Sequence, residues 1–334
     1  MLLLTGAPVG LRVDRRSTGS VIHMMRYFML LFLFVLTSCG APPSRELQTP
    51  TPSPRSTSLP PTTTPIPAPR TELAFPAPQG TETLDQCTSG KGTMTSLKIR
   101  DPHLIRDLEF QVFLPPCYYE NKNTRFPTLY LLHGLNQTGE QWDHLGIAET
   151  TLHLLESDEF QPMIIIMPWE RTGLDMESAL VDVLLPYIEG RYRTCVDPGC
   201  RAIGGLSRGG GLALQIALQN ANLFGSLGMH SPAVINSDSW LAYRLKNRTL
   251  DQLPRIWIDI GGKDSLRSST ENLLDLLDDF EVPYSWHLSD GEHNDEYWIS
   301  QLESYLRWYN EGWLDFDTDD AGTPTQSLPP GLIE

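Results

Sequence analysis

Short apolar runs, each followed by a glycine, proline or histidine, constrain the fold of this chain most. Residues 127–132 read PTLYLL, residues 163–167 read MIIIM, and residues 256–260 read IWIDI. Runs of this length are typical of strands that are buried on both faces of a parallel sheet. With 334 residues, 40% of them apolar, the chain can bury a large core around such strands.

Helical patterns separate these runs, and the alternation extends from about residue 83 to residue 313. The expected strands are 93–99, 108–114, 127–132, 163–167, 202–204, 256–260 and 284–288, of which the first two alternate like antiparallel strands. The expected helices are 177–192, 210–220, 273–280 and 298–309. This order predicts an α/β fold, with a mostly parallel central sheet and helices on both faces. Sites in such sheets lie at the carboxyl ends of the strands.

The beginning of the chain has the pattern of an export signal. Arg26 precedes a run of ten apolar residues, Tyr27 to Leu36, which is too short to span a bilayer but suits a signal-peptide core. The sequence Leu-Thr-Ser-Cys39-Gly that follows resembles the lipobox of bacterial lipoproteins. This resemblance implies a lipidated Cys39, an extracytoplasmic location and membrane contact only through that lipid. The alternative is a cleaved signal with an unrelated cysteine.

Four segments are expected along the chain. They are a signal peptide over 1–39, a disordered linker over 40–82, a catalytic domain over 83–313 and a flexible acidic tail over 314–334. The linker is expected because residues 41–80 contain 12 of the 27 prolines, mixed with Thr and Ser, and such a stretch cannot bury a core. The charged stretch before Met24 does not fit a short signal, so the real start is expected at Met24 or Met25.

Composition narrows the partners of the protein. The formal net charge is −16, which argues against nucleic acid as a partner, because phosphate binding needs a basic face.

Apart from Cys39, the cysteines are Cys87, Cys117, Cys195 and Cys200. The last two flank a tight turn and are expected to pair, which leaves Cys87 with Cys117; buried free thiols are the alternative. The sequence contains neither a Cys-x-x-Cys motif nor a histidine-rich cluster that would suggest a zinc site, so no metal is expected.

Gly205-Leu-Ser207-Arg-Gly209 fits the pattern G-x-S-x-G, the nucleophile elbow. The pattern alone is weak, but here it follows an expected strand, opens an expected helix and occurs once. Glycines there let strand and helix approach closely at a strained turn that exposes the hydroxyl. Ser207 is therefore the candidate nucleophile, and a structural Gly-rich turn is the alternative.

A serine hydroxyl needs a base to take its proton and an acid to orient that base. Asp264, just after the strand 256–260, is the candidate acid, and Asp259 inside that strand is more plausibly structural because it faces away from the isoleucines. Asp290, a third candidate, reads as a turn residue. The candidate base is His293, because the order Ser, Asp, His is the one that α/β-hydrolases use; His230 is the alternative.

The oxyanion of the reaction needs two backbone N–H donors. One is expected from Arg208, the residue after the nucleophile, and the other from Leu135 in the turn after the strand 127–132, with Asn136 next in line. The Arg208 side chain is expected to be solvent-facing or ion-paired, although it could also meet an acidic substrate group.

Together with other segments, these candidate residues give the chain a resemblance to the putative-esterase branch of the α/β-hydrolases, which includes feruloyl esterases, acetyl xylan esterases and esterase D. The matching residues are 130–134, Trp142, 162–168, 185–189, 192–193, 201–210, 222–224, 261–264, Gly291, His293 and Trp298. The resemblance implies the α/β-hydrolase fold and ester hydrolysis through an acyl-enzyme, with no cofactor and no metal. Within this branch, the sequence most resembles feruloyl esterases that are attached to xylan-degrading enzymes. Arg208 stands where many members have an apolar residue.

Four residues are expected to contact the substrate, a small-molecule or polysaccharide-linked ester. Trp142 follows the oxyanion loop, Trp169 and Glu170 follow the strand 163–167, and His230 suits a pocket wall. Aromatic side chains there could stack a phenolic acyl group or a sugar, and the alternative is that the tryptophans belong to the core or to the rim.

Three other functions compete with ester hydrolysis of plant polysaccharides. Mycolyltransferases share this fold and triad, so acyl transfer is the first alternative, and siderophore-ester hydrolysis is another. A lipid-anchored binding protein is the third, but it would require the Ser, Asp and His to fall at strand ends by coincidence.

Overall fold

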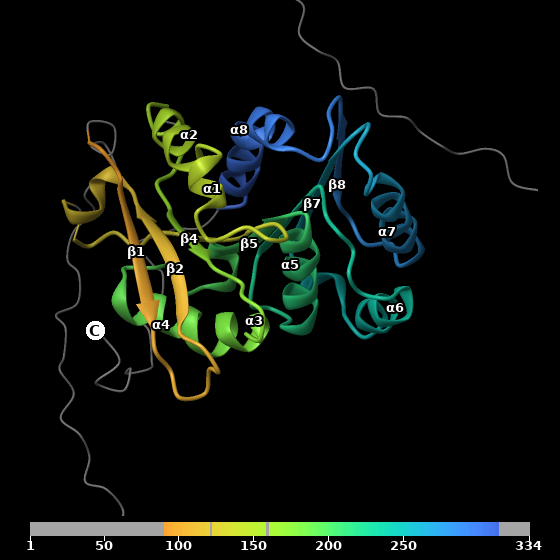
Figure 1. Cartoon of the computed structure of the whole chain (residues 1–334), viewed down its shortest axis with the longest axis horizontal. Helices are drawn as coiled ribbons and strands as arrows, with labels where there is room; N and C mark the ends of the chain where they lie inside the picture. Colours follow the sequence, from red (N-terminus) through yellow and green to blue (C-terminus); the bar gives the residue numbers. More distant parts are fainter. Residues whose placement is uncertain (1–89, 121, 158–159, 314–334) are drawn as a thin grey trace, which may run out of the picture. The chain divides into compact units, whose positions relative to one another are not determined.

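The computed structural model describes residues 90–313, apart from residue 121 and residues 158–159 (Figure 1). The predicted signal peptide, linker and tail lie outside the described residues, as do Cys39 and Cys87 and the side chain of Cys117. Lipidation and the Cys87–Cys117 pairing therefore stay predictions. Across the described part of the chain, no helix combines the length and the apolar character needed to cross a membrane.

A mostly parallel sheet organises the described residues, as the apolar runs predict. Its strands are β1 Thr93–Ile99, β2 Leu108–Leu114, β3 Thr128–Leu132, β4 Ile164–Pro168, β5 Arg201–Leu206, β6 Ser226–His230, β7 Arg255–Gly261 and β8 Ser285–Ser289. Their order in the sheet is β1-β2-β4-β3-β5-β6-β7-β8. The pairs β1–β2 and β2–β4 are antiparallel, whereas β3 to β8 pair in parallel with their neighbours.

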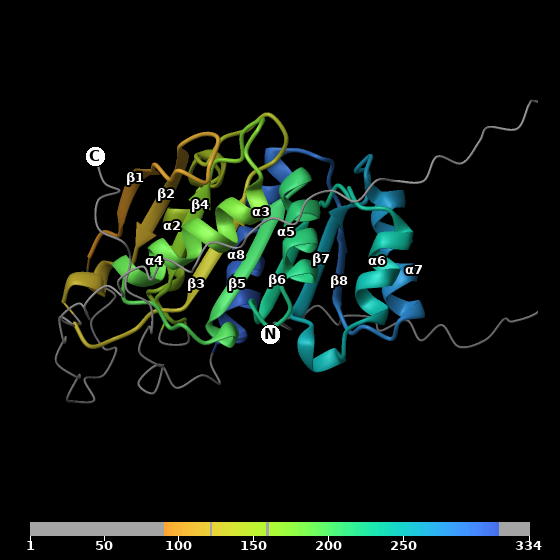
Figure 2. The same cartoon turned by 90° about the horizontal axis from the view of Figure 1, so that it is seen from below.

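Helices cover both faces of this sheet (Figures 1 and 2). They are α1 Gln141–His144, α2 Ile147–Leu154, α3 Met176–Ser178, α4 Leu185–Arg191, α5 Arg208–Gln219, α6 Asp238–Lys246, α7 Arg267–Asp279 and α8 Asp295–Glu311. In Figure 2, α4 and α5 lie on one side of the strands and α8 on the other.

Alternation along each strand divides the core between the two faces. In β3, Tyr130 and Leu132 belong to the apolar cluster that includes residues of α4 to α7. Leu129 and Leu131 belong to the cluster that includes residues of α1, α2 and α8. All five residues of β3 are buried, because successive side chains of a strand point to opposite faces and both faces are covered.

Several elements differ from the sequence-based expectation. The helix expected over 177–192 is α3, a π-helical segment Ala179–Leu184 and then α4. Pro186 lies in the first turn of α4 and has no N–H, so the α-helical hydrogen bond to the residue four positions earlier is missing where the π segment ends. Helix α7 begins at Arg267 rather than Leu273, because its first turns are polar and carry no apolar periodicity.

The predicted disulfide between Cys195 and Cys200 is present, with the two Cα atoms 5.8 Å apart. A single 3-10 turn, Pro198–Cys200, closes the short loop, and the Asp197 carboxylate accepts a hydrogen bond of 2.8 Å from the Gly199 N–H. The bridge lies directly before β5, so it ties down the segment that leads to the serine motif.

Candidate active site

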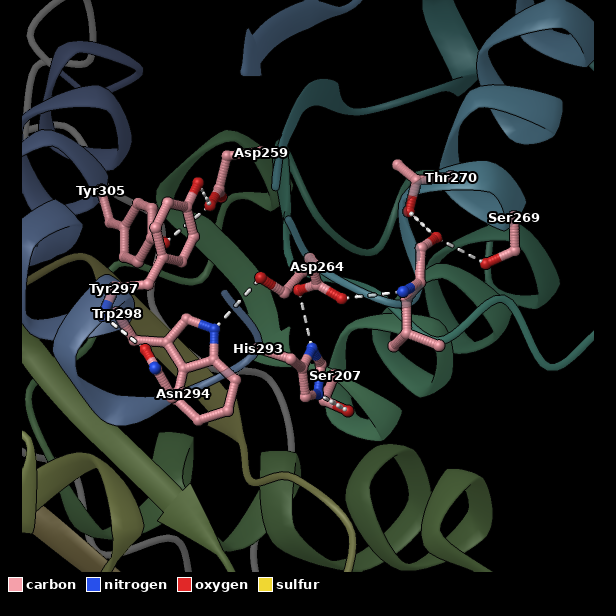
Figure 3. Close-up of polar contacts among 12 residues, drawn as sticks. Ser207, Asp259, Asp264, Ser269, Thr270, His293, Asn294, Tyr297, Trp298 and Tyr305 are labelled. Atoms are coloured by element: carbon pink, nitrogen blue, oxygen red, sulfur yellow. Dashed lines mark hydrogen bonds and ion pairs between the residues drawn. The ribbon is translucent and has the colours of Figure 1, made fainter. Parts of the chain in front are cut away.

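The parallel strands deliver the three candidate residues to one edge of the sheet. Ser207 follows β5, Asp264 follows β7 and His293 follows β8. Because β5, β7 and β8 all run in the same direction, the loops after them meet at the carboxyl edge (Figure 3). The sheet thus brings together residues that are far apart in the sequence.

These three side chains form one hydrogen-bonded chain, drawn in Figure 3. Ser207 Oγ lies 2.9 Å from His293 Nε2, and His293 Nδ1 lies 2.7 Å from Asp264 Oδ2. A carboxylate accepts hydrogen bonds only, so it holds the ring proton on Nδ1 and leaves Nε2 free to take a proton from the serine. The Asp264 side chain is fully buried, whereas that of His293 is 27% exposed and open to a substrate.

Ser207 has a backbone conformation that non-glycine residues rarely adopt, with φ 54° and ψ −117°. A residue held in such a region costs about 1–3 kcal/mol and persists only when its surroundings enforce it. Here the Ser207 N–H donates to the His230 carbonyl at 2.9 Å, and the Ala233 N–H donates to the Ser207 carbonyl at 2.9 Å. Strand β6 and the loop after it therefore clamp the turn.

Two glycines of the motif make this turn sterically feasible. A Cβ on Gly205 would lie 2.3 Å from the carbonyl carbon of Gly209, and a Cβ on Gly209 would lie 2.4 Å from the carbonyl oxygen of Leu132. Either contact is far shorter than side chains tolerate. Helix α5 can begin directly against β5 and β3 only because both positions lack a side chain.

Two further contacts hold the Asp264 carboxylate. Its Oδ1 accepts a hydrogen bond of 2.8 Å from the Leu266 N–H, and the Ser231 hydroxyl also bonds to the carboxylate. Burial raises the pKa of Asp264, but the hydrogen bonds from His293, Leu266 and Ser231 outweigh it and leave the pKa below its ordinary value. Asp264 therefore stays ionised at neutral pH and retains the charge that a protonated His293 needs.

Sequence reasoning missed the role of Ser231 and the placement of Trp298. The Trp298 indole N–H donates to Ser231 Oγ at 3.1 Å, and its ring packs edge-on against the His293 ring with centroids 5.1 Å apart (Figure 3). Trp298 stands in α8, whose first residue follows the N-cap Asn294, and the Asn294 side chain accepts the Tyr297 N–H at 3.0 Å. This cap fixes the helix start next to His293.

The loop after β3 is held by its own set of hydrogen bonds. The Gly134 N–H donates to Gln141 Oε1 at 2.7 Å. His133 Nε2 accepts the Glu170 N–H at 2.8 Å, so in the neutral ring the proton is on Nδ1 and is donated to the Gly134 carbonyl at 2.8 Å. Burial lowers the pKa of His133, which favours this neutral form. Asn136 follows with φ 63°.

Leu135 and Arg208, the two predicted oxyanion donors, line one hollow of about 680 Å³. Arg208 is the first residue of α5, and the first N–H groups of a helix have no intrahelical acceptor. Leu135 is 63% exposed. Both residues thus line the same hollow, and Arg208 directly follows Ser207 in the chain.

Trp169 and Glu170 line the same hollow, and Glu170 is ion-paired there. Its carboxylate receives two hydrogen bonds from the Arg208 guanidinium, Nη2 to Oε1 at 2.6 Å and Nε to Oε2 at 3.0 Å. The hydrogen bonds that Arg208 donates to Glu170, together with the charge of that carboxylate, raise the pKa of Arg208 against the effect of burial. The Arg208 side chain is thus occupied by a protein carboxylate.

Two of the residues expected to contact the substrate are placed elsewhere, and those predictions are wrong. Trp142 is 1% exposed, and its indole N–H donates to the Leu132 carbonyl at 3.1 Å. His230 is 0% exposed and stacks on Tyr305, with ring centroids 3.7 Å apart. Both lie in the protein interior, so neither can line a pocket, and His230 cannot serve as the alternative base.

Asp259 is the centre of a buried polar cluster in the protein interior. His230 Nδ1 lies 2.7 Å from Asp259 Oδ1, which also accepts the Trp257 indole N–H at 2.9 Å. The Tyr297 and Tyr305 hydroxyls donate to Asp259 Oδ2 at 3.0 and 2.7 Å. This confirms the structural interpretation of Asp259, because all its partners belong to the protein core.

Replacing Asp259 with alanine is expected to lower the free energy of unfolding by about 3–5 kcal/mol, because several buried donors lose their acceptor at once. Urea unfolding measures the change. Asp278→Ala is the matched control, since Asp278 also accepts a tyrosine hydroxyl, that of Tyr284 at 2.9 Å, but on the exposed surface. The control should cost less than about 1 kcal/mol. Equal losses for the two variants would contradict a structural centre at Asp259.

No group of three or more His, Cys, Asp or Glu side chains converges as a set of metal ligands within the described ranges.

Asp290, the third candidate acid, lies at the surface and forms an ion pair of 3.6 Å with Lys263.

Comparison with known proteins places the chain in a family. A family model described as putative esterase matches residues 102–309. An esterase of Mycobacterium tuberculosis is 30% identical over 193 residues, which cover 51% of this chain and 40% of that protein. An endo-1,4-beta-xylanase/feruloyl esterase of Xylanibacter ruminicola is 30% identical over 136 residues, which cover 36% of this chain and 19% of that protein. The chain thus spans less than half the length of these relatives.

Solved structures agree on the fold. A ferulic acid esterase matches with a TM-score of 0.61 at 24% identity and covers 67% of this chain and 99% of its own. An S-formylglutathione hydrolase of Staphylococcus aureus matches with a TM-score of 0.54 at 18% identity and covers 65% and 98%. These likenesses establish the α/β-hydrolase fold that the sequence resemblance implies. With the family model matched over most of the described residues, the chain belongs to the putative esterase family.

Proposed function

We propose that this protein is a serine carboxylic-ester hydrolase that works through an acyl-enzyme. The observation that carries the proposal is the hydrogen-bonded chain from Ser207 Oγ to His293, 2.9 Å, and from His293 to Asp264, 2.7 Å. Membership of the putative esterase family supports the same chemistry. In this proposal Ser207 is the nucleophile, His293 the general base and acid, and Asp264 the group that orients His293.

Acylation follows from this geometry. Ser207 Oγ attacks the ester carbonyl carbon while His293 Nε2 takes the hydroxyl proton. The carbonyl oxygen becomes an oxyanion, which the backbone N–H groups of Leu135 and Arg208 stabilise. When the intermediate collapses, the ester C–O bond breaks and His293 gives its proton to the leaving alcohol. The acyl group remains on Ser207.

Deacylation uses the same residues with water in place of the alcohol. His293 takes a proton from a water molecule, whose oxygen attacks the acyl carbon, and then returns the proton to Ser207 Oγ. The carboxylic acid leaves and the serine is restored. Because the His293 side chain is 27% exposed, bulk water can reach the point at which this attack starts.

Feruloyl or acetyl esters of plant polysaccharides are the substrates that we propose. Two relatives support this choice by their names, the xylanase/feruloyl esterase and the ferulic acid esterase. Trp169 lines the hollow next to the oxyanion donors and offers an aromatic face to a phenolic acyl group or a sugar. Substrate binding by Trp169 and Glu170 belongs to this proposal.

A substrate panel and an active-site label test the proposal together. Purified protein is assayed on methyl ferulate, acetylated xylan and short p-nitrophenyl esters, with acyl transfer to a sugar measured alongside. A fluorophosphonate is added separately, and the modified peptide is identified by mass spectrometry. Ester hydrolysis with labelling at Ser207 is the expected result. A protein that is not labelled and hydrolyses none of the esters contradicts the proposal, and products dominated by acyl transfer would reassign it as an acyltransferase.

We also propose that the enzyme is exported and anchored through a lipid on Cys39. Its support is the sequence before Cys39, and the disulfide Cys195–Cys200 is consistent with an oxidising compartment. In a bacterial host, Cys39→Ala should move the protein from the membrane fraction to the soluble fraction, because the lipidation site is lost. Fractionation measures this, and Ser38→Ala, which keeps the cysteine, is the control. Equal membrane association of Cys39→Ala and the unaltered protein would contradict the anchor.

A further inference from the structure

We propose that the hollow beside Ser207 selects esters that carry a second, anionic group, and that Arg106 binds the carboxylate of such a substrate. This inference rests on the proposed ester hydrolysis and specifies its substrate class.

Strand direction explains why Arg106 reaches the catalytic edge. β1 pairs antiparallel with β2, and β2 pairs antiparallel with β4, so β1 runs in the same direction as β4. The connection from β1 to β2 therefore lies at the edge where the loop after β4 begins. Arg106 stands in that connection and lines the same hollow as Leu135 and Arg208.

Contacts with the start of β2 hold the loop after β4 in place. The Trp169 N–H donates to the Glu109 carbonyl at 2.8 Å. Arg171 forms an ion pair of 3.3 Å with the Glu109 carboxylate, donates to the Asp107 carbonyl, and lies over the Trp169 ring. The start of β2 thus anchors the loop after β4, whose residues 169–174 line the hollow together with Arg106.

The Arg106 side chain lies near Gly173. The Gly173 φ of 88° favours glycine, and a Cβ built there would lie 3.7 Å from Arg106 Nε. Arg106 Nε therefore lies within van der Waals range of the Gly173 position, and both residues line the hollow. The loop that bears Gly173 also supplies Trp169 and Glu170 to the same hollow.

The charges that line the hollow are unevenly neutralised. Arg208 is held by Glu170 and Arg171 by Glu109. Arg106 is exposed, and within residues 90–313, apart from the gaps, no hydrogen bond or ion pair of its guanidinium is observed. The lining residues include Arg106, Arg171 and Arg208 but a single carboxylate, Glu170. In a chain of net charge −16, this local positive excess identifies an anion as the complementary ligand.

Geometry limits the ligand further. Because Arg106 lines the same hollow as Leu135 and Arg208, the proposed oxyanion donors, one molecule can hold its ester at those donors and a carboxylate at Arg106. A guanidinium binds a carboxylate through parallel N–H donors. The carboxylate can belong to the acyl part of the ester or to its alcohol part, and the chemistry at Arg106 is the same in both.

Paired substrates distinguish these two sources. In the acyl arm, 4-nitrophenyl hydrogen glutarate is compared with its methyl-capped neutral analogue. In the alcohol arm, 4-acetoxybenzoate is compared with 4-acetoxybenzamide. For each arm the ratio of kcat/KM for the anionic ester to that for the neutral ester is measured, and comparing this ratio between variants cancels the intrinsic reactivity of the esters.

Arg106→Gln should lower this ratio by about three- to tenfold in the arm that matches the natural substrate, mainly through KM. Arg106→Lys should retain part of the preference, because it keeps the charge but loses the fork of donors. Glu170→Gln should raise the ratio, because it frees Arg208. Lys246→Gln is the matched control: it removes one positive charge from an exposed position on α6, and the ratio should not change.

The outcomes separate this inference from the proposed function. If neutral esters are hydrolysed and Arg106→Gln leaves both ratios unchanged, the anion site is wrong and the esterase stands. A similar fall in Arg106→Gln and Lys246→Gln would show a long-range effect of net charge and would overturn a local site. Absence of all ester hydrolysis, with no fluorophosphonate labelling of Ser207, would remove both proposals. Turnover of the neutral esters by each variant shows that it is folded.

Discussion

Replacing Ser207 with alanine is expected to lower kcat for ester hydrolysis by about four to six orders of magnitude, with little change in KM. The reason is that the hydroxyl is the only group on the described site surface that is hydrogen-bonded to His293 Nε2, at 2.9 Å, so its loss removes the covalent route. Residual hydrolysis over the uncatalysed rate should persist, because the oxyanion donors and the binding hollow remain. The measurement is steady-state hydrolysis of a p-nitrophenyl ester, together with fluorophosphonate labelling, which should vanish.

A second serine variant provides the control for this experiment. Ser268 lies exposed in the first turn of α7, away from the hydrogen-bonded chain, so Ser268→Ala should keep activity and labelling. The melting temperature of Ser207→Ala should stay close to that of the unaltered protein, because alanine can keep the strained backbone and the clamp from His230 and Ala233. Esterase activity in Ser207→Ala comparable to that of Ser268→Ala would refute the proposed nucleophile.

The arrangement of Ser207, Asp264 and His293 could be predicted from the sequence for physical reasons. Each follows a strand of the parallel sheet, and parallel strands place their carboxyl ends together. Gly205 and Gly209 could be identified because a strand and a helix approach closely at that turn, and the structure shows that a Cβ at either position would clash with backbone atoms. Local pattern and sheet topology therefore suffice for these positions.

The pocket could not be predicted in the same way. Trp142 follows the loop after β3, and His230 ends β6, so the sequence places both near the catalytic edge. Whether each side chain points into a pocket or into the core depends on packing against distant segments. His230 turns inward because Asp259, Tyr305 and Tyr309 offer it a buried polar environment. Nothing in the residues around His230 encodes these partners, which come from β7 and α8.

Contacts between remote segments also account for the supporting residues that sequence reasoning missed. Gln141 fixes the loop after β3 through the Gly134 N–H, from a helix of four residues that is too short to show periodicity. Ser231, which follows β6, accepts a hydrogen bond from Trp298 in α8 and bonds to the Asp264 carboxylate after β7. Arg106 becomes relevant only when the pairing of β1 with β2 and of β2 with β4 sets the direction of β1.

Replacing Asp264 with asparagine is expected to lower kcat by about three to four orders of magnitude while KM changes little. Asparagine can keep the bond from the Leu266 N–H, but its amide can offer an N–H to His293 Nδ1 where the carboxylate accepts one at 2.7 Å. The ring would then carry its proton on Nε2 and could not accept the proton of Ser207. Steady-state kinetics at neutral pH, where the Asp264 carboxylate is ionised, measures the effect.

The two other acidic candidates make this prediction specific. Asp290→Asn alters an exposed carboxylate only three residues before His293, paired with Lys263 at 3.6 Å, and should leave kcat unchanged. Asp259→Ala should act mainly on stability, since its partners are buried and none of them is Ser207 or His293. A large loss of kcat in Asp264→Asn with near-native stability would separate orienting the base from supporting the core. If Asp264→Asn retained more than about a tenth of kcat, orientation of His293 by this carboxylate would be wrong, because its burial and its short bond to Nδ1 would then contribute to folding alone.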